Sequence, residues 1–275
     1  MYKVTLDPGH DQFSNISPVN PKYVEGVQMW KLATYLKSAL EKYGIEVVLT
    51  RPRLEDKIPE VYDRGKIAAN NDSDLMISLH SNAPFSVDGT FDQTITGTSV
   101  YYSLTDADNK DLADKLGAAI SKTMGHMYRG SLTRAYGDGH PNWDYYGVIR
   151  GAARNGCTAA FLIEHGFHTC PKDIKFLLYD NYLETLAAAE AKVIAEYFGV
   201  KAKQQLYRVQ IGSFTNRKYA ETYKTKVAAD GYQAFVFKVG KYYRVQIGSF
   251  SNYTNAEHYA DKARTDGYQA FIVEV

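Results

Sequence analysis

Three apolar segments of this sequence end in residue types that carry out hydrolytic or metal chemistry. "YKVTLDPGH" ends at His10, "DLMISLH" ends at His80 and "AAFLIE" ends at Glu164. A single polar residue after a strand is commonly structural, but His, His and Glu at three strand ends form a pattern. In open α/β sheets, ligands bind at the carboxyl ends of the strands. The sequence therefore predicts that these three side chains meet at one edge of a sheet.

Two histidines with a carboxylate are the ligand set that a catalytic zinc ion commonly uses, with a fourth position left for water. The candidates for the carboxylate ligand are Asp7, Asp11, Glu25 and Glu164. Glu25 is expected in the first helical turn, where the helix dipole also favours an acidic residue, so its position alone does not decide its role. Asp7 is expected to organise the turn before Gly9, and Asp11 has only its proximity in favour. The residues themselves leave the carboxylate ligand open.

The elements that must position these residues alternate between strand and helix through residues 1–198. Strands are predicted at 2–7, 45–50, 74–80, 98–103 and 159–164, and helices at 25–43, 61–71, 108–124 and 182–198. This alternation predicts an α/β fold with a largely parallel sheet flanked by helices. Segments 83–97 and 126–147 are long and lack periodicity, which is typical of binding loops.

The C-terminal part of the chain is an internal repeat. Residues 207–239 match residues 243–275 at a constant offset of 36, with 20 of 33 positions identical. Each copy has the pattern strand, helix, strand. Two such units predict a small α+β domain of the ferredoxin-like βαββαβ type, with four antiparallel strands and both helices on one sheet face. We therefore expect domains at 1–198 and 205–275, joined by a polar linker at 199–204.

Five features carry a resemblance to a known family. In order along the chain they are "DPGH", a Glu at the start of the next helix, "VVLTR", "YDRGKIAANNDSDLMISLHSNA" and "FLIEHGF". Together they resemble the zinc-dependent N-acetylmuramoyl-L-alanine amidases of bacterial cell-wall lysis, over residues 1 to about 198. The resemblance implies that His10, Glu25 and His80 bind Zn²⁺ and that Glu164 is the catalytic acid/base. "HDQFSN" departs from the glycine-rich stretch usual after the first histidine, and Cys170 stands where Asn is common.

The repeat resembles the SPOR domain, a peptidoglycan-binding module, and finding both modules in one chain strengthens each assignment. In the first copy, strand alternation places Val209 and Ile211 on one face and polar side chains on the other. Because the apolar set must cover the helices, the polar set lines the open sheet face. Its members in the two copies are Arg208, Gln210, Arg244 and Gln246. Gln amides both donate and accept hydrogen bonds, which suits the hydroxyl and acetamido groups of a glycan strand.

The resemblance implies hydrolysis of the amide bond between N-acetylmuramic acid and L-alanine in peptidoglycan. Zinc activates water in such sites and polarises the carbonyl, and Glu164 would pass the proton from water to the leaving amine. Another zinc-dependent peptidase or deacetylase of the wall uses the same residue types and is the first alternative. A non-catalytic glycan- or RNA-binding protein is the second, because RNA-recognition folds also present a four-stranded sheet.

Composition limits the partners. The net charge of +1 divides into +4 for residues 205–275 and −3 for the remainder, which gives no argument for nucleic acid. No apolar run approaches a membrane span of roughly 20 residues, and "MYKVTLDPGH" has no signal-peptide pattern. We expect synthesis in the cytoplasm and action on the wall after release, in a phage endolysin or a mother-cell lysis enzyme. The two cysteines, Cys157 and Cys170, are expected as reduced thiols.

The remaining histidines and one arginine need separate expectations. His165 follows Glu164 on the strand, so we expect it to point to the opposite face in a structural role. His140 and His168 lie in aromatic-rich loops where substrate contact is an open alternative. We expect His126 and His258 on the surface. Arg64 is open between an internal ion pair and a substrate contact.

Overall fold

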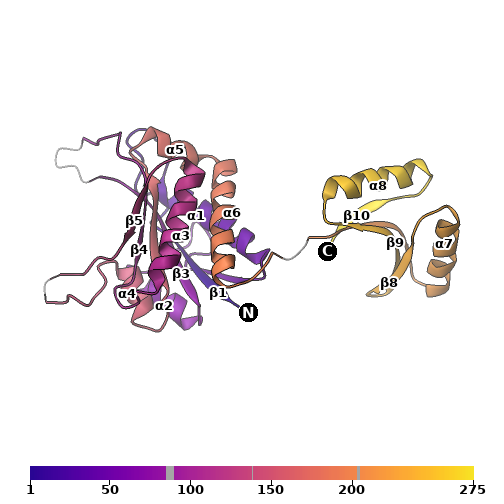
Figure 1. Cartoon of the computed structure of the whole chain (residues 1–275), viewed down its shortest axis with the longest axis horizontal. Helices are drawn as coiled ribbons and strands as arrows, with labels where there is room; N and C mark the ends of the chain where they lie inside the picture. Colours follow the sequence, from indigo (N-terminus) through magenta and orange to yellow (C-terminus); the bar gives the residue numbers. More distant parts are fainter. Residues whose placement is uncertain (85–89, 138, 203–204) are drawn as a thin grey trace. The chain divides into compact units, whose positions relative to one another are not determined.

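The computed structural model describes residues 1–84, 90–137, 139–202 and 205–275. The chain divides into two compact units, Met1–Ala202 and Lys203–Val275, each with its own sheet and core (Figure 1). Part of the predicted linker, residues 203–204, lies outside the described residues, as does part of the predicted loop at 83–97.

The first unit is built on a six-stranded sheet with the order β2-β1-β3-β6-β4-β5. Its strands are β1 (Lys3–Pro8), β2 (Glu46–Leu49), β3 (Leu75–Asn82), β4 (Thr98–Tyr102), β5 (Tyr128–Leu132) and β6 (Ala160–Phe167). All neighbours pair in parallel except β4 and β6, which are antiparallel. The predicted largely parallel α/β sheet is confirmed, and β1, β3 and β6 end at the same edge.

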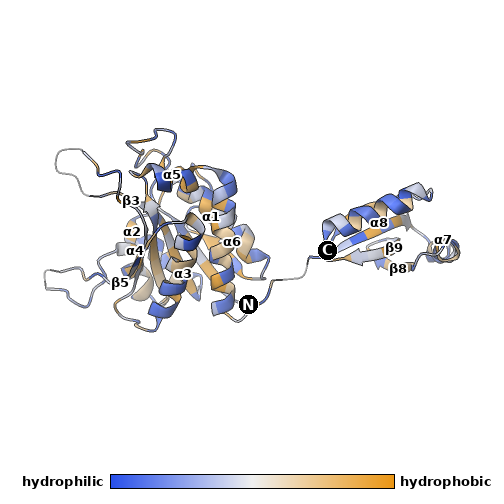
Figure 2. Ribbon diagram, turned by 45° about the horizontal axis from the view of Figure 1, so that its top comes forward, coloured by the Kyte–Doolittle hydropathy of each residue, from blue (hydrophilic) through white to orange (hydrophobic). Residues whose placement is uncertain are grey.

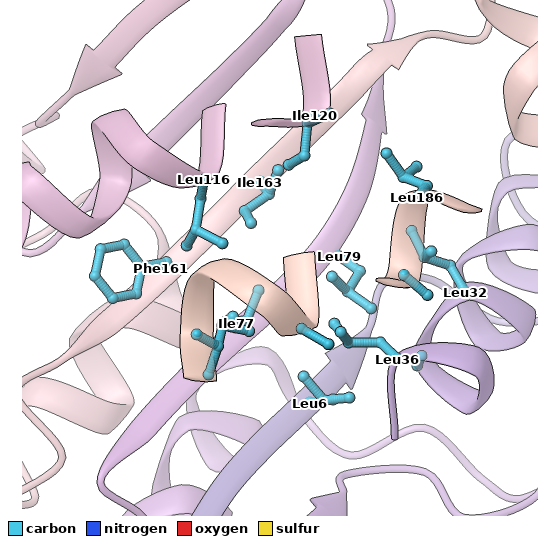
Figure 3. Packing of buried hydrophobic residues seen from close by; sticks show 14 of the residues in the cluster. Leu6, Leu32, Leu36, Ile77, Leu79, Leu116, Ile120, Phe161, Ile163 and Leu186 are labelled. Atoms are coloured by element: carbon cyan, nitrogen blue, oxygen red, sulfur yellow. The ribbon is translucent and has the colours of Figure 1, made fainter. Parts of the chain in front are cut away.

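Helices cover both faces of this sheet. They are α1 (Glu25–Glu41), α2 (Val61–Asn70), α3 (Asn109–Met124), α4 (Gly147–Ala153), α5 (Pro171–Leu178) and α6 (Asp180–Tyr197). The main core lies between the sheet and α1, α3, α5 and α6, where Leu32, Leu36 and Leu186 meet Ile77 and Ile163 (Figure 3). A smaller core packs α2 and α4 on the opposite face, against Met76, Ala160 and Leu162. Alternate residues of one strand therefore enter different cores, as the period of two requires.

Three elements were not predicted. β5 and the start of α4 lie inside the segment 126–147, which we expected to be a loop, and α5 lies between two predicted elements. β5 is a five-residue edge strand whose side chains are all at least partly exposed, so it lacks an apolar face in the sequence. α4 and α5 are seven and eight residues long, too short for helical periodicity to stand out.

The second unit contains β7 (Tyr207–Phe214), α7 (Arg217–Ala229), β8 (Phe235–Val239), β9 (Tyr242–Phe250), α8 (Tyr253–Thr265) and β10 (Phe271–Glu274). Its sheet has the order β10-β7-β9-β8 with every pair antiparallel, which is the predicted ferredoxin-like arrangement. Val209, Ile211, Val245 and Ile247 are buried against the alanines of α7 and α8. Figure 2 shows the apolar and polar sides of these helices.

Candidate active site

The predicted catalytic residues lie on the α2/α4 face of the sheet, at the carboxyl ends of β1, β3 and β6. Along β3 the sequence alternates, so Ser78 and His80 share the face of Met76. On β6, Glu164 shares the face of Ala160 and Leu162 and stands directly opposite His80 in the strand register. The strand-end pattern in the sequence is therefore confirmed as a single cluster.

His10 is positioned by a tight turn that packs against the start of α1. Its φ of 59° is left-handed, an unusual conformation for a non-glycine residue. Gly9 allows the turn to approach the His80 ring, since a Cβ there would lie 2.3 Å from it. The buried Arg51 donates to the carbonyl oxygens of both His10 and Gly26, at 2.9 and 3.1 Å. Arg51 thus ties the His10 turn to the first turn of α1, which carries Glu25.

His10, Glu25 and His80 form a compact donor set of two nitrogens and one oxygen. One ligand atom from each lies within 4.8 Å of the others. Glu25 Oε2 is 3.6 Å from His10 Nε2, and Glu25 Oε1 is 3.2 Å from His80 Nδ1. Among the residues that the structure describes, this is the only group of three or more His, Cys, Asp or Glu side chains arranged to hold a metal ion.

The electrostatics of the cluster keep Glu25 ionised. Burial would raise its pKa, but the hydrogen bond with His80 and the nearby imidazoles outweigh burial and lower the pKa to about 2. Burial opposes charge on His80 as well, and the contact with Glu25 nevertheless raises the pKa of its imidazole. Burial lowers the pKa of His10. A carboxylate beside two imidazoles suits a divalent cation, which would replace the proton shared by His80 and Glu25.

A buried relay orients His80. Ser78 Oγ donates to Asp7 Oδ2 at 2.7 Å and lies 3.1 Å from His80 Nε2. Because the hydroxyl hydrogen of Ser78 is used on Asp7, His80 Nε2 donates to Ser78 and leaves Nδ1 facing Glu25. Thr50 donates to the other Asp7 oxygen at 2.6 Å. Asp7 thus links neighbouring strands, and the expectation that it organises the turn before Gly9 is wrong.

Other polar residues form hydrogen bonds that fix the position of Glu25, and the sequence analysis did not predict most of them. Asn15 Nδ2 donates to Glu25 Oε2 at 2.7 Å, and the backbone N–H of Ser81 donates to Oε1 at 2.8 Å. His168 is buried and bonds to Ser81 Oγ at 3.0 Å, beneath the stacked Tyr23 ring. In the sequence, only the serines on both sides of His80 in "SLHSN" indicate that such supporting residues are present.

Glu164 stands apart from the donor set and has a different environment. Burial raises the pKa of its carboxyl to about 7, and the negative charge of Glu25 adds to the effect. Its Oε2 atom is buried without a hydrogen-bond partner among the described residues. Glu164 lines a cleft of about 250 Å³ together with His10, His80, Arg64 and Tyr146. An unpartnered carboxyl with a pKa near neutrality is suited to accept and return a proton.

Asp11 and Arg64, which the sequence left open, have defined contacts. Asp11 accepts hydrogen bonds from Phe13 N and Ser14 Oγ within its own turn, at 2.8 Å each. Arg64 donates to the Pro59 carbonyl and lies 3.7 Å from Asp7 Oδ2, and it also lines the cleft. Arg64 therefore forms the internal ion pair and faces the space where substrate would lie.

The other histidines divide between structural and exposed positions. His165 points to the α6 face, 3.3 Å from Glu190, as predicted, and His258 is exposed as predicted. The surface prediction for His126 is wrong, because its side chain is only 5% exposed and lies 2.9 Å from Asp173. The left-handed cap at Gly125 ends α3 and turns the following residue inward. His140 is exposed and stacks on Trp143 at 4.0 Å.

In the second unit, the side chains predicted on the open sheet face share that face in the strand register. Arg208, Gln210 and Arg244 line a hollow of about 220 Å³ with Phe237. Gln246 pairs with Gln210 across β7 and β9, and its amide donates to the Gly248 carbonyl. Phe235 and Phe271, equivalent positions of the repeat, are each 60% exposed opposite Gln246 and Gln210. These two rings were missed, although the repeat itself marks them as a pair.

The fold and the cluster together define a protein of the α/β class with a His/Glu/His donor set, in which Glu25 is buried, beside the second buried carboxyl of Glu164. Residues 4–196 match the family model described as N-acetylmuramoyl-L-alanine amidase, and residues 203–274 match that of the SPOR domain. The chain belongs to the N-acetylmuramoyl-L-alanine amidase family, and the predicted resemblance is confirmed. It is a peptidoglycan amidase with a SPOR domain, and its partner is peptidoglycan.

Similar proteins agree with this membership. The sporulation-specific N-acetylmuramoyl-L-alanine amidase of Bacillus subtilis is 25% identical over 241 residues, which cover 86% of this chain and 84% of that protein. The catalytic domain of CwlV from Bacillus (Paenibacillus) polymyxa var. colistinus has a TM-score of 0.59 and 25% identity, covering 73% of this chain and 100% of that one. An N-acetylmuramoyl-L-alanine amidase of Clostridium difficile 630 has a TM-score of 0.58 and 26% identity, covering 72% of this chain and 97% of that one.

In the part of the chain that the structure describes, no helix is both long and apolar enough to cross a membrane. Cys157 and Cys170 are free and buried.

Proposed function

We propose that this amidase depends on zinc held by His10, Glu25 and His80. The observation that carries the proposal is the approach of their three ligand atoms to within 4.8 Å, with Glu25 ionised. When bound, zinc would supply a Lewis acid that polarises the scissile carbonyl and favours ionisation of water. The relay from Asp7 through Ser78 supports a ligand role for His80, since metal-binding histidines commonly use their other nitrogen in this way.

Glu164 is the catalytic acid/base of this proposal. Its carboxylate accepts a proton from the attacking water and then donates it to the nitrogen of the departing L-alanine. A pKa of about 7 matches both directions of transfer near neutral pH. Burial of the partnerless Oε2 atom leaves the carboxyl free of competing hydrogen bonds. Tyr146, Val148 and Leu162 form apolar parts of the cleft wall and restrict water around this carboxyl.

Product analysis with metal analysis tests this function. The purified full chain is incubated with purified peptidoglycan after dialysis against a chelator and after re-addition of zinc. We expect new amino groups of L-alanine without new reducing ends, and recovery of activity on zinc addition. Release of a different amino acid would favour the wall-peptidase alternative, and release of acetate would favour the deacetylase. Full turnover in metal-free protein would contradict zinc dependence.

The open face of the second unit is proposed to bind the glycan strands of peptidoglycan. Arg208, Gln210 and Arg244 share one hollow, and the guanidinium of Arg208 lies 5.4 Å from the Phe237 ring centre. Amide and guanidinium groups match the hydroxyl and acetamido groups of the sugars, while the exposed Phe235 and Phe271 offer rings for their apolar faces. We expect a preference for glycan without stem peptides, which is the product of the amidase.

Binding of fragment 205–275 to wall with and without its stem peptides tests the glycan proposal. The fragment is a suitable probe because it has its own sheet and core. Stronger retention on the stripped wall is expected. Equal retention would contradict product targeting, and no retention on either would contradict the glycan role.

We also propose the domain boundaries 1–198, 199–204 and 205–275, and action of the enzyme on the wall during lysis. The name of the Bacillus subtilis relative favours mother-cell lysis during sporulation over a phage endolysin. Immunoblotting of growing and sporulating cells would distinguish the two: appearance of the protein only during sporulation would favour mother-cell lysis.

A further inference from the structure

Two stretches of chain, residues 134–137 and 139–146, are held together at their base and adjoin the catalytic cleft. Ala135 and Asp144 form an antiparallel bridge, and Tyr145 N donates to the Arg134 carbonyl at 2.8 Å. The buried Asp144 accepts hydrogen bonds from Ser103 Oγ and Leu104 N, at 2.9 and 2.7 Å. These contacts fasten the base of the segment to the end of β4, so the side chains at its base have defined positions.

Three arginines lie within or after this segment, and two of them are exposed to solvent. Arg150 donates to the carbonyl oxygens of Asp144 and Tyr145 and is structural. Arg134 lies 3.6 Å from the centre of the Tyr145 ring, and Arg154 lies 4.3 Å from the Trp143 ring; both are exposed. Within the described ranges 1–84, 90–137, 139–202 and 205–275, no carboxylate forms an ion pair with either side chain. Among the described residues, these two positive charges therefore have no carboxylate partner.

Tyr146 connects Arg134 to the cleft. Its side chain lines the cleft with Glu164, and it directly follows Tyr145, whose ring Arg134 covers. Arg134 therefore lies next to the residue that forms this part of the cleft wall. Arg154 follows the C-terminal end of α4 and reaches the segment through its contact with the Trp143 ring.

The surface fits a carboxylate better than a sugar ring. Trp143 is the largest aromatic side chain of the segment, but the His140 ring stacks on it at 4.0 Å and the Arg154 guanidinium lies over it as well. The partly exposed rings of Tyr145 and Tyr136 each have a guanidinium over them, from Arg134 and Arg150. Guanidinium groups stacked on rings keep their N–H edges free, and those edges form paired hydrogen bonds with carboxylates.

We propose that Arg134 binds a free carboxylate of the peptidoglycan stem peptide, close to the amide bond that is cut. The inference rests on the proposed catalytic site, because that site places the scissile amide beside Glu164. The second residue of the stem, a γ-linked D-glutamate, carries a free α-carboxylate in some walls and an amide in others. Arg134 therefore selects for the stem peptide with the free carboxylate.

Two soluble substrates and one matched control test this subsite. N-acetylmuramoyl tripeptides with the D-glutamate α-carboxyl either free or amidated are hydrolysed by the full-length wild type, by Arg134→Gln and by Lys115→Gln. Lys115 is an exposed cation on α3, so its variant has the same loss of charge at a distant place. Melting temperature and zinc content are measured for each protein.

We expect Arg134→Gln to raise KM for the free-carboxylate peptide by about 3- to 10-fold, as for a partly exposed charge pair, with kcat unchanged. KM for the amidated peptide and all parameters of Lys115→Gln should stay within about twofold. An equal loss on both peptides, or no loss on either, would overturn the subsite. If the wild type hydrolyses neither peptide, the proposed function fails and the subsite fails with it.

Discussion

The two units of this protein place polar residues in opposite ways. In the catalytic unit, His10, His80 and Glu164 occur once each at strand ends and Glu25 once at the start of α1, where it is 1% exposed. In the repeat unit, the residues that we propose to bind glycan occur in pairs on an open sheet face, such as Gln210 with Gln246 and Phe235 with Phe271. Burial changes the acid–base properties of a side chain, whereas repetition multiplies weak contacts with a repetitive polymer.

The catalytic unit shows how far burial can separate two carboxyl groups of the same type. Glu25 has a pKa near 2 because imidazoles and a backbone N–H outweigh its burial. Glu164 has a pKa near 7 because its burial is not offset by hydrogen bonds. One carboxyl is thus prepared to remain an anion and the other to exchange a proton.

The largest effect is expected for substitution of one of the three proposed metal ligands. His10→Ala, Glu25→Ala and His80→Ala should each weaken zinc binding by more than about 100-fold, beyond the loss typical of outer residues. Zinc affinity is measured by competition with a chromophoric chelator, with Gln210→Ala on the open face as the control. Wild-type zinc affinity in Glu25→Ala would mean that another carboxylate is the ligand, and that the burial of Glu25 does not serve metal binding.

A smaller loss is expected when the buried relay is cut. Ser78→Ala removes the group between Asp7 and His80 and should weaken zinc binding by about 10- to 100-fold, since His80 loses its orienting partner. Thr50→Val is the matched control, because it removes the other hydroxyl on Asp7 and leaves Ser78 in place. Equal affinities in wild type and Ser78→Ala would show that the relay is only structural.

On the open face, repetition should make single substitutions mild and paired substitutions severe. Gln210→Ala and Gln246→Ala should each lower wall binding by about 2- to 3-fold, and the double variant by about 10-fold. Co-sedimentation with stripped wall measures binding, while hydrolysis of a soluble muramoyl peptide should remain at the wild-type rate. A single variant as weak as the double would mean that the two halves do not act as separate contacts.

The smallest effect concerns stability without metal. A folded-state pKa of about 7 for Glu164, above the ordinary 4.5, means that the folded protein binds an extra proton between these pH values. Stability therefore falls as pH rises from about 4.5 to 7. Metal-free Glu164→Gln should be more stable than wild type by about 1–3 kcal/mol at pH 8 and equal to it at pH 4. Denaturant titrations at both pH values measure this; a constant difference would contradict the raised pKa.

Sequence patterns predicted the parts of this fold that have strong periodicity. The apolar strands that end at His10, His80 and Glu164, the long helix from Glu25 and the βαβ repeat all matched the structure. β5 was missed because it is short and has no buried side chain, and α4 and α5 were missed because they are short.

The residues that support the cluster were harder to predict for a physical reason. Ser78, Asn15 and Arg51 act through hydrogen bonds that depend on how distant segments approach, and their residue types are common on any surface. His126 illustrates the same limit, because the left-handed Gly125 cap decides that its side chain turns inward. The sequence pattern also left four carboxylates open beside the two histidines, because only the fold shows that the start of α1 brings Glu25 next to His80.

The most direct test of this account is to measure zinc content and turnover together in the Glu164→Gln variant. Gln keeps the shape of the side chain and removes its ability to accept a proton. We predict full zinc content with turnover on purified peptidoglycan reduced by at least about 100-fold, as expected for loss of a general base. Loss of zinc would make Glu164 a ligand, and retained turnover would show that another group transfers the proton; either result would contradict the division of roles between Glu25 and Glu164.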